Sequence, residues 1–485
     1  MNPEAKESSK SGSALVMVLV VLLIVTALST VSLRNSMQLM RLSQRQVWME
    51  QAHFAAESGL EEAARLINSS TYMGASVTTV THTLPGGGSA SVVITPLNSQ
   101  GNEFSIQSTS TVQGITREVN IGRIYRPTYL NYGNFYEDFQ NLWWIYGELI
   151  DGKVWTGNTQ NIYGYTLSNG EKYGPIFTDL NETGANGFGG YPQYASTLKE
   201  GGDEDDYDDL QFWNEYEDGY DTNVSMPALL DVDFDRTSMI ADALDVDPDE
   251  INPSLVTPEN MPKGKALKLK GRTEIRFSVD TIGGEEVGIL EIRNWNKFGN
   301  FNWNPVYSES LDLVYVEKLT SGPGGHRGAT LRIGDSNHNT PNIVKANLTV
   351  WAEDDVTIPT HIIYDNQNLD ESTDKIGVIS KDDIWFDRKF TGDLVVQGGY
   401  IATGAVSSSN QGELGLIDYN KFGVRGTLYF LGSMVAQRVS PFGVFSGNSF
   451  VSGFQTDHRF DKRFATDPPP FTPVISSQIN YEDWF

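Results

Sequence analysis

The pattern of hydrophobic and polar positions changes sharply near residue 70 of this chain. Residues 13–33 form an uncharged apolar run of 21 residues, and residues 34–67 place apolar positions at helical spacing. The apolar run is long enough to cross a bilayer as a helix, and no glycine or proline stands where the two parts meet. The pattern therefore predicts one continuous helix over residues 13–68, roughly 80 Å long, whose first part spans a membrane.

Residues 75–124 show the two-residue alternation that is typical of strands. Four alternating runs are joined by short segments that contain glycine, which predicts a small antiparallel sheet. The runs cover residues 75–81, 89–95, 103–110 and 116–121. Because these runs follow the helix directly, we expect the sheet to pack on the C-terminal half of the helix as a small head.

Residues 135–485 contain many short apolar runs, each followed by glycine or asparagine. Examples are residues 346–351, 376–380 and 394–398. Short strands with such corners are typical of the stacked coils of a β-solenoid, although the repeat length varies. A β-sandwich produces similar strands. The predicted fold class is therefore mainly β, with one long N-terminal α-helix, a small antiparallel head and a β-solenoid-like body, a β-sandwich being the alternative.

Two segments of the body differ from the rest. Residues 200–261 are acidic and rich in proline, which indicates an insertion or a side subdomain. Residues 454–485 contain a triple proline flanked by aromatic residues, which predicts an extended strap. We expect this strap to lie across a sheet or to cap the last coil of the body.

Charge and composition narrow the possible partners and chemistry. The formal net charge of −27 is unchanged without residues 1–12, and so acidic a surface repels phosphate backbones. We therefore expect no nucleic-acid partner. The absence of cysteine excludes disulfides and thiol chemistry, and the six histidines lack the spacing of zinc ligands. Since no nucleophile elbow or phosphate-binding loop is present either, we predict that the chain is not an enzyme.

The densest group of carboxylates provides a weak calcium candidate. Residues 203–221 contain ten carboxylates and no lysine or arginine, and carboxylate oxygens are the ligands that Ca²⁺ prefers. The spacing is not that of an EF-hand, and a solvated acidic loop explains the same residues. We expect no other cofactor. The candidate ligands are Asp203, Asp205, Asp206, Asp208 and Asp209.

Two motifs in the N-terminal region resemble those of a known family. Residues 10–17 (KSGSALVM) resemble a prepilin processing site that is cut between Gly12 and Ser13, and residues 55–63 (AAESGLEEA) are similar to the segment that closes the N-terminal helix of PilX-like minor pilins. The chain thus resembles a type IV minor pilin or pilus-assembly protein that carries a PilX-like N-terminal segment and a large β-rich body.

This resemblance implies a maturation route and a set of partners. Prepilin peptidase would remove residues 1–12, and the new N-terminus would be methylated. The helix would sit in inner-membrane lipid before assembly and then pack against other pilin-like subunits through residues such as Met17, Glu57 and Gly59. The body would be periplasmic or extracellular on a filament. Major pilins carry glutamate at the fifth mature position, where this chain has Met17. The difference implies a minor, initiating or tip subunit, or else a protein outside the fibre.

The resemblance leads us to expect a minor pilin or pseudopilin-like subunit that presents a large acidic β domain for adhesion or partner contact. Three considerations keep alternatives open. Counting Arg34, Arg41 and Arg45 beside the apolar run predicts a cytoplasmic body, whereas the resemblance implies export. The aromatic clusters at residues 135–146 and 212–220 also suit a membrane-anchored β-helix that binds or cleaves polysaccharide, and cleavage requires a pair of carboxylates. An envelope scaffold held by a simple membrane span is the third possibility.

Overall fold

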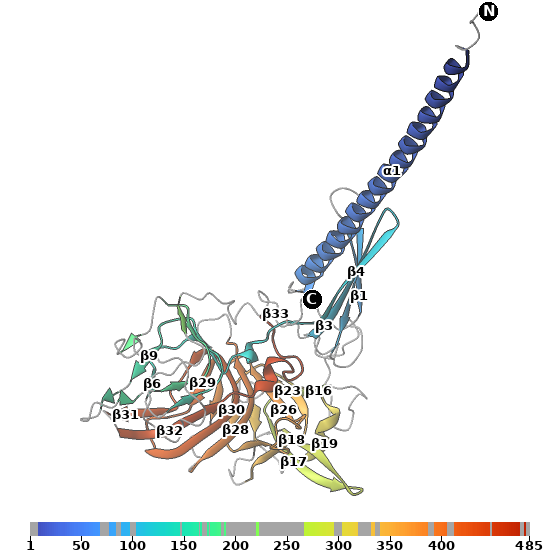
Figure 1. Cartoon of the computed structure of the whole chain (residues 1–485). Helices are drawn as coiled ribbons and strands as arrows, with labels where there is room; N and C mark the ends of the chain where they lie inside the picture. The colour runs from blue at the N-terminus through green and yellow to red at the C-terminus, as the bar shows by residue number, and fades with distance from the viewer. Residues whose placement is uncertain are drawn as a thin grey trace, which may run out of the picture.

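The computed structural model consists of a long helix, a small head and a large curled body that is mainly β (Figure 1). This architecture confirms the predicted fold class at the level of helix, antiparallel head and β-rich body. The structure describes residues 8–67, 77–83, 89–97, 103–145, 148–163, 165–166, 172–173, 175–185, 189–190, 220–222, 266–294, 303–318, 331–334, 340–386, 392–404, 412–446, 449–475 and 480–481.

Helix α1 (Ser8–Ile67) is one uninterrupted rod of 60 residues, which corresponds to roughly 90 Å. It contains no proline, so every turn can form its backbone hydrogen bonds. The hydroxyls of Thr26 and Thr30 donate to the carbonyls of Leu22 and Thr26, which satisfies these polar groups inside the apolar stretch. The helix starts at Ser8 rather than at residue 13 as predicted, because Gly12 alone, which costs about 1 kcal/mol relative to alanine, does not end it.

The head is a meander of four antiparallel strands, β1 (Thr78–Thr83), β2 (Ser89–Pro96), β3 (Glu103–Val112) and β4 (Ile115–Tyr125). Gln113 and Gly114 both have positive φ in the tight turn between β3 and β4, as two-residue hairpins require. Alternate residues of β2 and β3 are buried against Leu60, Ala63 and Ile67 of α1.

The body contains three ladders of parallel strands, which is not the antiparallel pairing of the β-sandwich alternative. The coils from β20 to β30 contribute a strand or part of a long strand to each ladder, whereas the coils that begin at β5, β8 and β13 contribute none to the second. The first ladder runs through β16 (Ala266–Lys270), β20 (Leu313–Glu317), β23 (Asn347–Ala352), β26 (Lys375–Ser380), β28 (Leu394–Ala402), β30 (Val424–Val439), β5 (Asn134–Asp138), β8 (Val154–Thr156), β13 (Asn181–Thr183) and β15 (Tyr220–Thr222).

The other two ladders form the remaining faces. The second contains β17 (Thr273–Ile282), β21 (Leu331–Ile333), β24 (Val356–Ile358), β27 (Ile384–Phe386), β29 (Glu413–Leu416) and the end of β30. The third contains β22 (Asn342–Val344), β25 (Ile362–Tyr364), the first halves of β28 and β30, β32 (Ser449–Arg459), β7 (Leu149–Ile150) and β12 (Ile176–Phe177).

Shorter strands complete the sheets. β18 (Glu285–Asn294) and β19 (Asn304–Tyr307) extend β17 as an antiparallel hairpin, and β31 (Gly443–Ser446) pairs with β32 in the same way. β6 (Trp143–Ile145), β9 (Asn161–Tyr163) and β14 (Gly189–Gly190) form a separate parallel sheet, while β10 (Tyr165–Thr166) and β11 (Lys172–Tyr173) form a small hairpin. The short helices are η1 (Tyr129–Asn131), η6 (Ser308–Ser310) and η7 (Lys462–Ala465).

The order of the coils in space differs from their order in the chain. The coil that starts at β5 stacks on β30, where Asn134 pairs with Met434. β15 and β16 therefore stand at opposite ends of the first ladder, although they flank residues 223–265 in the sequence. The predicted insertion, residues 200–261, lies outside the described residues except at β15.

Both faces of the first ladder are buried. Its inner face joins the main hydrophobic core, and its outer face carries a second cluster that includes Trp351 and Val435. Residues 467–475 cover this outer face. The hydroxyl of Thr349 donates to the carbonyl of Pro470, and the N–H of Ile475 donates to the carbonyl of Pro127 at 2.8 Å. The strap thus lies along a side of the body rather than over its last coil. Beyond it, β33 (Asn480–Tyr481) pairs with β4 as a fifth strand of the head sheet.

Candidate functional site

The N-terminal part of α1 presents a long apolar surface that no part of the described chain covers. Residues 14–47 are exposed throughout, and Met17 is 71% exposed. The helix is long and apolar enough to cross a membrane. Exposed apolar area of this extent is unfavourable in water, so lipid or other protein segments must cover it in the working protein.

The C-terminal third of α1 is covered by the head. Small residues line this side of the helix, and Gly59 allows the closest approach of the sheet. A Cβ atom at Gly59 would lie 2.4 Å from Oγ of Ser108 and 2.9 Å from Cβ of Ala90. Oγ of Ser58 also lies 3.2 Å from Nε2 of His82 in β1. The motif at residues 55–63 therefore attaches the head to the helix within one chain.

The residues predicted for processing and assembly lie in different environments along α1. Gly12 and Ser13 belong to the helix. Met17 is on the open surface, whereas Gly59 is buried under the head. Glu57 is partly exposed, and its Oε1 lies 3.2 Å from Nε2 of His53. Of the three assembly residues, Met17 has the surface most accessible to a neighbouring subunit.

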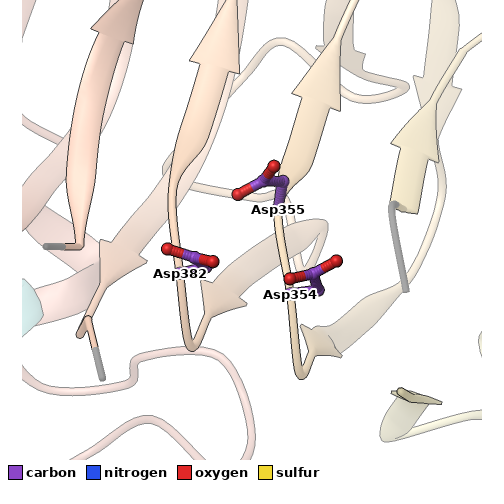
Figure 2. A group of neighbouring side chains, drawn as sticks. All are labelled: Asp354, Asp355 and Asp382. Carbon is purple, nitrogen blue, oxygen red and sulfur yellow. The ribbon is translucent and has the colours of Figure 1, made fainter. Parts of the chain in front are cut away.

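The predicted calcium ligands Asp203, Asp205, Asp206, Asp208 and Asp209 all lie outside the described residues. In the described part of the chain, a different group of carboxylates comes together. One carboxylate oxygen from each of Asp354, Asp355 and Asp382 lies within 4.8 Å of the others. Figure 2 shows the three side chains at the turns that follow neighbouring strands of the body.

Strand register brings these carboxylates together. β23 and β26 pair with Ala352 opposite Ser380, so the turns that follow the two strands stack. The N–H of Asp383 lies 3.4 Å from Oδ1 of Asp355, and the N–H of Glu413 donates to Oδ1 of Asp383 at 2.8 Å. Aspartates at these corners thus connect each coil to the next through hydrogen bonds.

The environment of the cluster disfavours its full ionisation. Burial, and then the neighbouring carboxylates, raise the pKa of Asp355 to about 6 and that of Asp382 to about 7. Nζ of Lys318 lies 3.1 Å from Oδ1 of Asp354 and supplies a nearby positive charge. These oxygens are of the type that binds hard cations, while the hydrogen bonds between coils give the aspartates a structural role without one.

The cluster of Asp354, Asp355 and Asp382 was not predicted from the sequence, because these residues do not lie in the segment where acidic residues are densest. The available signal was a repeat, because Asp354-Asp355 recurs as Asp382-Asp383 after 28 residues, each pair being followed directly by an apolar strand. In a body of parallel coils, equal positions in successive coils lie beside one another. The repeat places the carboxylates at one corner.

Comparison with known proteins supports the N-terminal assignment. Residues 11–61 match the PilX N-terminal family. The N-terminal segment is thus PilX-like, which confirms the resemblance, whereas the cut between Gly12 and Ser13 stays a prediction.

The remaining comparisons add little about the body. No curated protein matches the chain. The crystal structure of the competence-associated pilin ComZ from Thermus thermophilus aligns at 14% identity over 90% of this chain and 97% of ComZ, with a TM-score of 0.28. A TM-score this low does not show a shared fold.

Proposed function

We propose that this chain is a minor pilin or pseudopilin-like structural subunit of a type IV pilus or a related secretion filament. One observation carries the proposal: residues 14–47 of an unbroken helix are exposed, the first 20 of them form an uncharged apolar run, and the segment that the head covers follows directly. Such a helix can be covered by lipid before assembly and by the helices of other subunits afterwards. The PilX-like match over residues 11–61 falls on this same element.

The body suits a position at or near the tip of the filament. We infer that it is a β-solenoid of stacked coils, periplasmic or extracellular, that offers its acidic surface for adhesion or partner contact. The body is much wider than the rod that carries it (Figure 1), so neighbours along a fibre would crowd it while a tip position would not. Met17, in place of an acidic residue, favours the same position. The absence of enzymatic activity and the calcium candidate at Asp203–Asp209 remain predictions.

Leader removal gives the first test. The full chain is produced with an active prepilin peptidase and, as a control, with an inactive one, and its intact mass is measured. We expect the active enzyme alone to remove residues 1–12, so that the product begins at Ser13. Gly12→Val should block the cut, while Ser11→Ala should not. A product that keeps residues 1–12 beside an active peptidase would contradict the proposal.

Subunit contact gives the second test. A photo-crosslinking amino acid is placed at position 17, and at position 370 of the body as a control, in cells that assemble filaments. We expect position 17 to form adducts with the N-terminal helices of other pilin-like subunits. Position 370 should form no adduct with those helices. Adducts of position 17 with lipid alone would favour a simple membrane anchor instead.

A further inference from the structure

A pocket opens where the first coil of the body stacks on the last. The second ladder ends at Arg438 and Val439 of β30, and the β6–β9–β14 sheet takes its place in the next coils without pairing to it. The space between Phe139–Ile145 and Val439–Phe445 encloses about 550 Å³, which is a typical size for a small-molecule site. β6, β9, β31 and β32 lie together at the end of the body away from α1 (Figure 1).

Nine of the 24 residues that line this pocket carry a Tyr, Phe or Trp ring. Tyr136 and Phe139 are buried at its base, and Trp143 at its rim is 43% exposed. The ring of Trp144 stacks on Phe139 at 4.9 Å between centroids, and Phe139 in turn stacks with Tyr136 at 6.1 Å. The aromatic lining consists of Tyr136, Phe139, Trp143, Trp144, Tyr163, Tyr419, Phe442, Phe445 and Phe454.

One carboxylate, that of Glu148, lies among the described lining residues. Its Oε2 accepts the N–H of Ile145 at 2.9 Å, and its Oε1 accepts the hydroxyl of Thr456 at 2.8 Å. Ile145 belongs to β6 and Thr456 to β32, so these two bonds hold the carboxylate across the seam between the coils. Each carboxylate oxygen can still accept a further hydrogen bond.

The described lining contains no lysine or arginine to balance Glu148. Burial raises the pKa of Glu148 to about 7, against the opposing effect of its two hydrogen bonds. A carboxylate that is costly to ionise in this way gains most from a ligand that brings its own positive charge.

We propose that this pocket binds a small organic amine, with its ammonium group on Glu148 and its apolar body among the aromatic rings. Cations are attracted to the faces of Trp and Tyr, most strongly where water is excluded. An anion would meet the carboxylate without any compensating charge. Hydrolysis of a glycoside would need a second carboxylate, which the described lining does not provide. The proposal holds whether or not the chain enters a filament.

The pocket also predicts how binding depends on pH. The titratable groups that line the pocket with Glu148 are Tyr136 from β5, Tyr163 from β9, Tyr419 between β29 and β30, and His458 from β32. Burial raises the pKa of Tyr136 and lowers that of His458 to about 4, so neither carries charge near neutral pH. Glu148 then sets the pH dependence, and amine affinity should rise as the pH increases through 7.

The test uses isothermal titration calorimetry on the full chain in detergent. Phenethylamine serves as a free small amine. Nα-acetyl-lysine methylamide, whose ε-ammonium group is free, serves as the lysine side chain of a protein partner. 3-Phenylpropionate is the anion matched to phenethylamine. We expect at least one amine to bind at least tenfold more tightly than the anion, and more tightly at pH 8 than at pH 6. Tighter binding of phenethylamine would indicate a free small amine as the ligand, and tighter binding of the lysine derivative would indicate a lysine side chain of a protein partner.

Variants separate recognition from folding. Glu148→Gln should weaken amine binding at least tenfold and abolish its pH dependence. Trp143→Ala, at the exposed rim, should weaken it without unfolding the chain, and Glu371→Gln, an exposed glutamate outside the pocket, should leave it unchanged. Equal affinity for amine and anion, tighter binding of methyl glucoside than of either amine, or full affinity in folded Glu148→Gln would each overturn the proposal.

Discussion

Gly59 is the residue on which the junction between helix and head depends most. A side chain here would overlap Ser108, Ala90 and Val92, and these atoms belong to strands that cannot retreat without leaving the helix. Overpacking of this kind costs about 1–3 kcal/mol. We expect Gly59→Val to lose more than about 2 kcal/mol of head stability, measured by hydrogen exchange of β2 and β3.

Gly122 in β4 is the matched control for this substitution. A Cβ atom there would meet nothing within 4 Å, and valine suits an exposed strand position. Gly122→Val should therefore keep the exchange protection of β2 and β3. If both variants lose protection equally, the close contact at Gly59 is not what holds the head.

Asp382 predicts a pH dependence of stability. Its pKa in the folded chain, about 7, is above the ordinary aspartate value, so the folded state binds more protons than the unfolded state from about pH 4 to 7. The contribution is full below that range and is lost as the pH rises through 7. We expect Asp382→Asn to be more stable than the parent at pH 8 by roughly 0.5–1 kcal/mol after solvent screening, with no gain at pH 4.

Thermal unfolding across pH 4–8 measures this difference. Asp370 is exposed and away from the cluster, so Asp370→Asn is the control and should follow the parent at every pH. A parent whose stability rises from pH 5 to 8 relative to Asp382→Asn would show that Asp382 is ionised without cost, as a bound cation would make it.

Individual residues show what a sequence can reveal about this molecule. The AAESGLEEA motif at residues 55–63 identified the helix segment, but the contact of Gly59 with Ser108 depends on a sheet that lies 30 to 50 residues further along. A calcium site was predicted at residues 203–209 only because many carboxylates lie close together in that part of the sequence. The carboxylates that the fold brings together are sparse in the sequence, and strand register collects them.

At the scale of elements, the strap depends on an ion pair with a buried lysine. The side chain of Lys375 in β26 is 3% exposed and pairs with the carboxylate of Asp467, which is 55% exposed. Removing one partner leaves a buried charge, and the exposure of Asp467 moderates the loss. We expect Asp467→Asn to cost about 1–3 kcal/mol and to increase protease cleavage within residues 466–475.

The ion pair of Asp457 with Arg459 provides the control for the strap. Both residues are in β32, and the arginine is largely exposed, so Asp457→Asn should cost less than about 0.5 kcal/mol. Equal cleavage of the strap in both variants would mean that its proline and backbone contacts hold it without Lys375.

Elements with a local signal could be predicted, and those defined by distant partners could not. The long helix and the four head strands follow from periodicity within each segment. β23 and β26 are buried on nearly every residue, because the main core covers one face and the strap with η1 and η7 covers the other. A proline-rich terminal segment gives no sequence signal of which ladder it will cover, so capping of the last coil was the wrong expectation.

At the scale of the whole molecule, the order of coils limits the length of one connection. β15 and β16 are separated by ten strands of the first ladder, counting both. At ~4.8 Å per strand their separation is roughly 43 Å. A linker of about eight residues reaches at most about 28 Å, which is shorter than this separation. Replacing residues 223–265 by such an eight-residue linker should therefore unpair β15 and lower the Tm. A linker of about 24 residues is long enough and should do neither.

Differential scanning calorimetry and solution scattering would show the outcome. A monomer with the short linker and unchanged Tm would contradict the stacking of β5 on β30. This stacking could not be read from the sequence, because parallel coils of similar composition fit one another in many orders. The alternation of short apolar runs and turns indicates that coils exist, but it does not indicate that Asn134 will pair with Met434 and make these two coils neighbours.

The pairing of β5 with β30 also has a consequence in time. A chain that leaves the ribosome or a translocation channel from its N-terminus presents β5 about 300 residues before the strand that receives it. Until then the early coil has an open edge, which is vulnerable to aggregation. Closure of such distant pairs is slow, so the final shape can be completed only when synthesis is nearly finished, and a chaperone that shields residues 134–156 would be needed most during that interval.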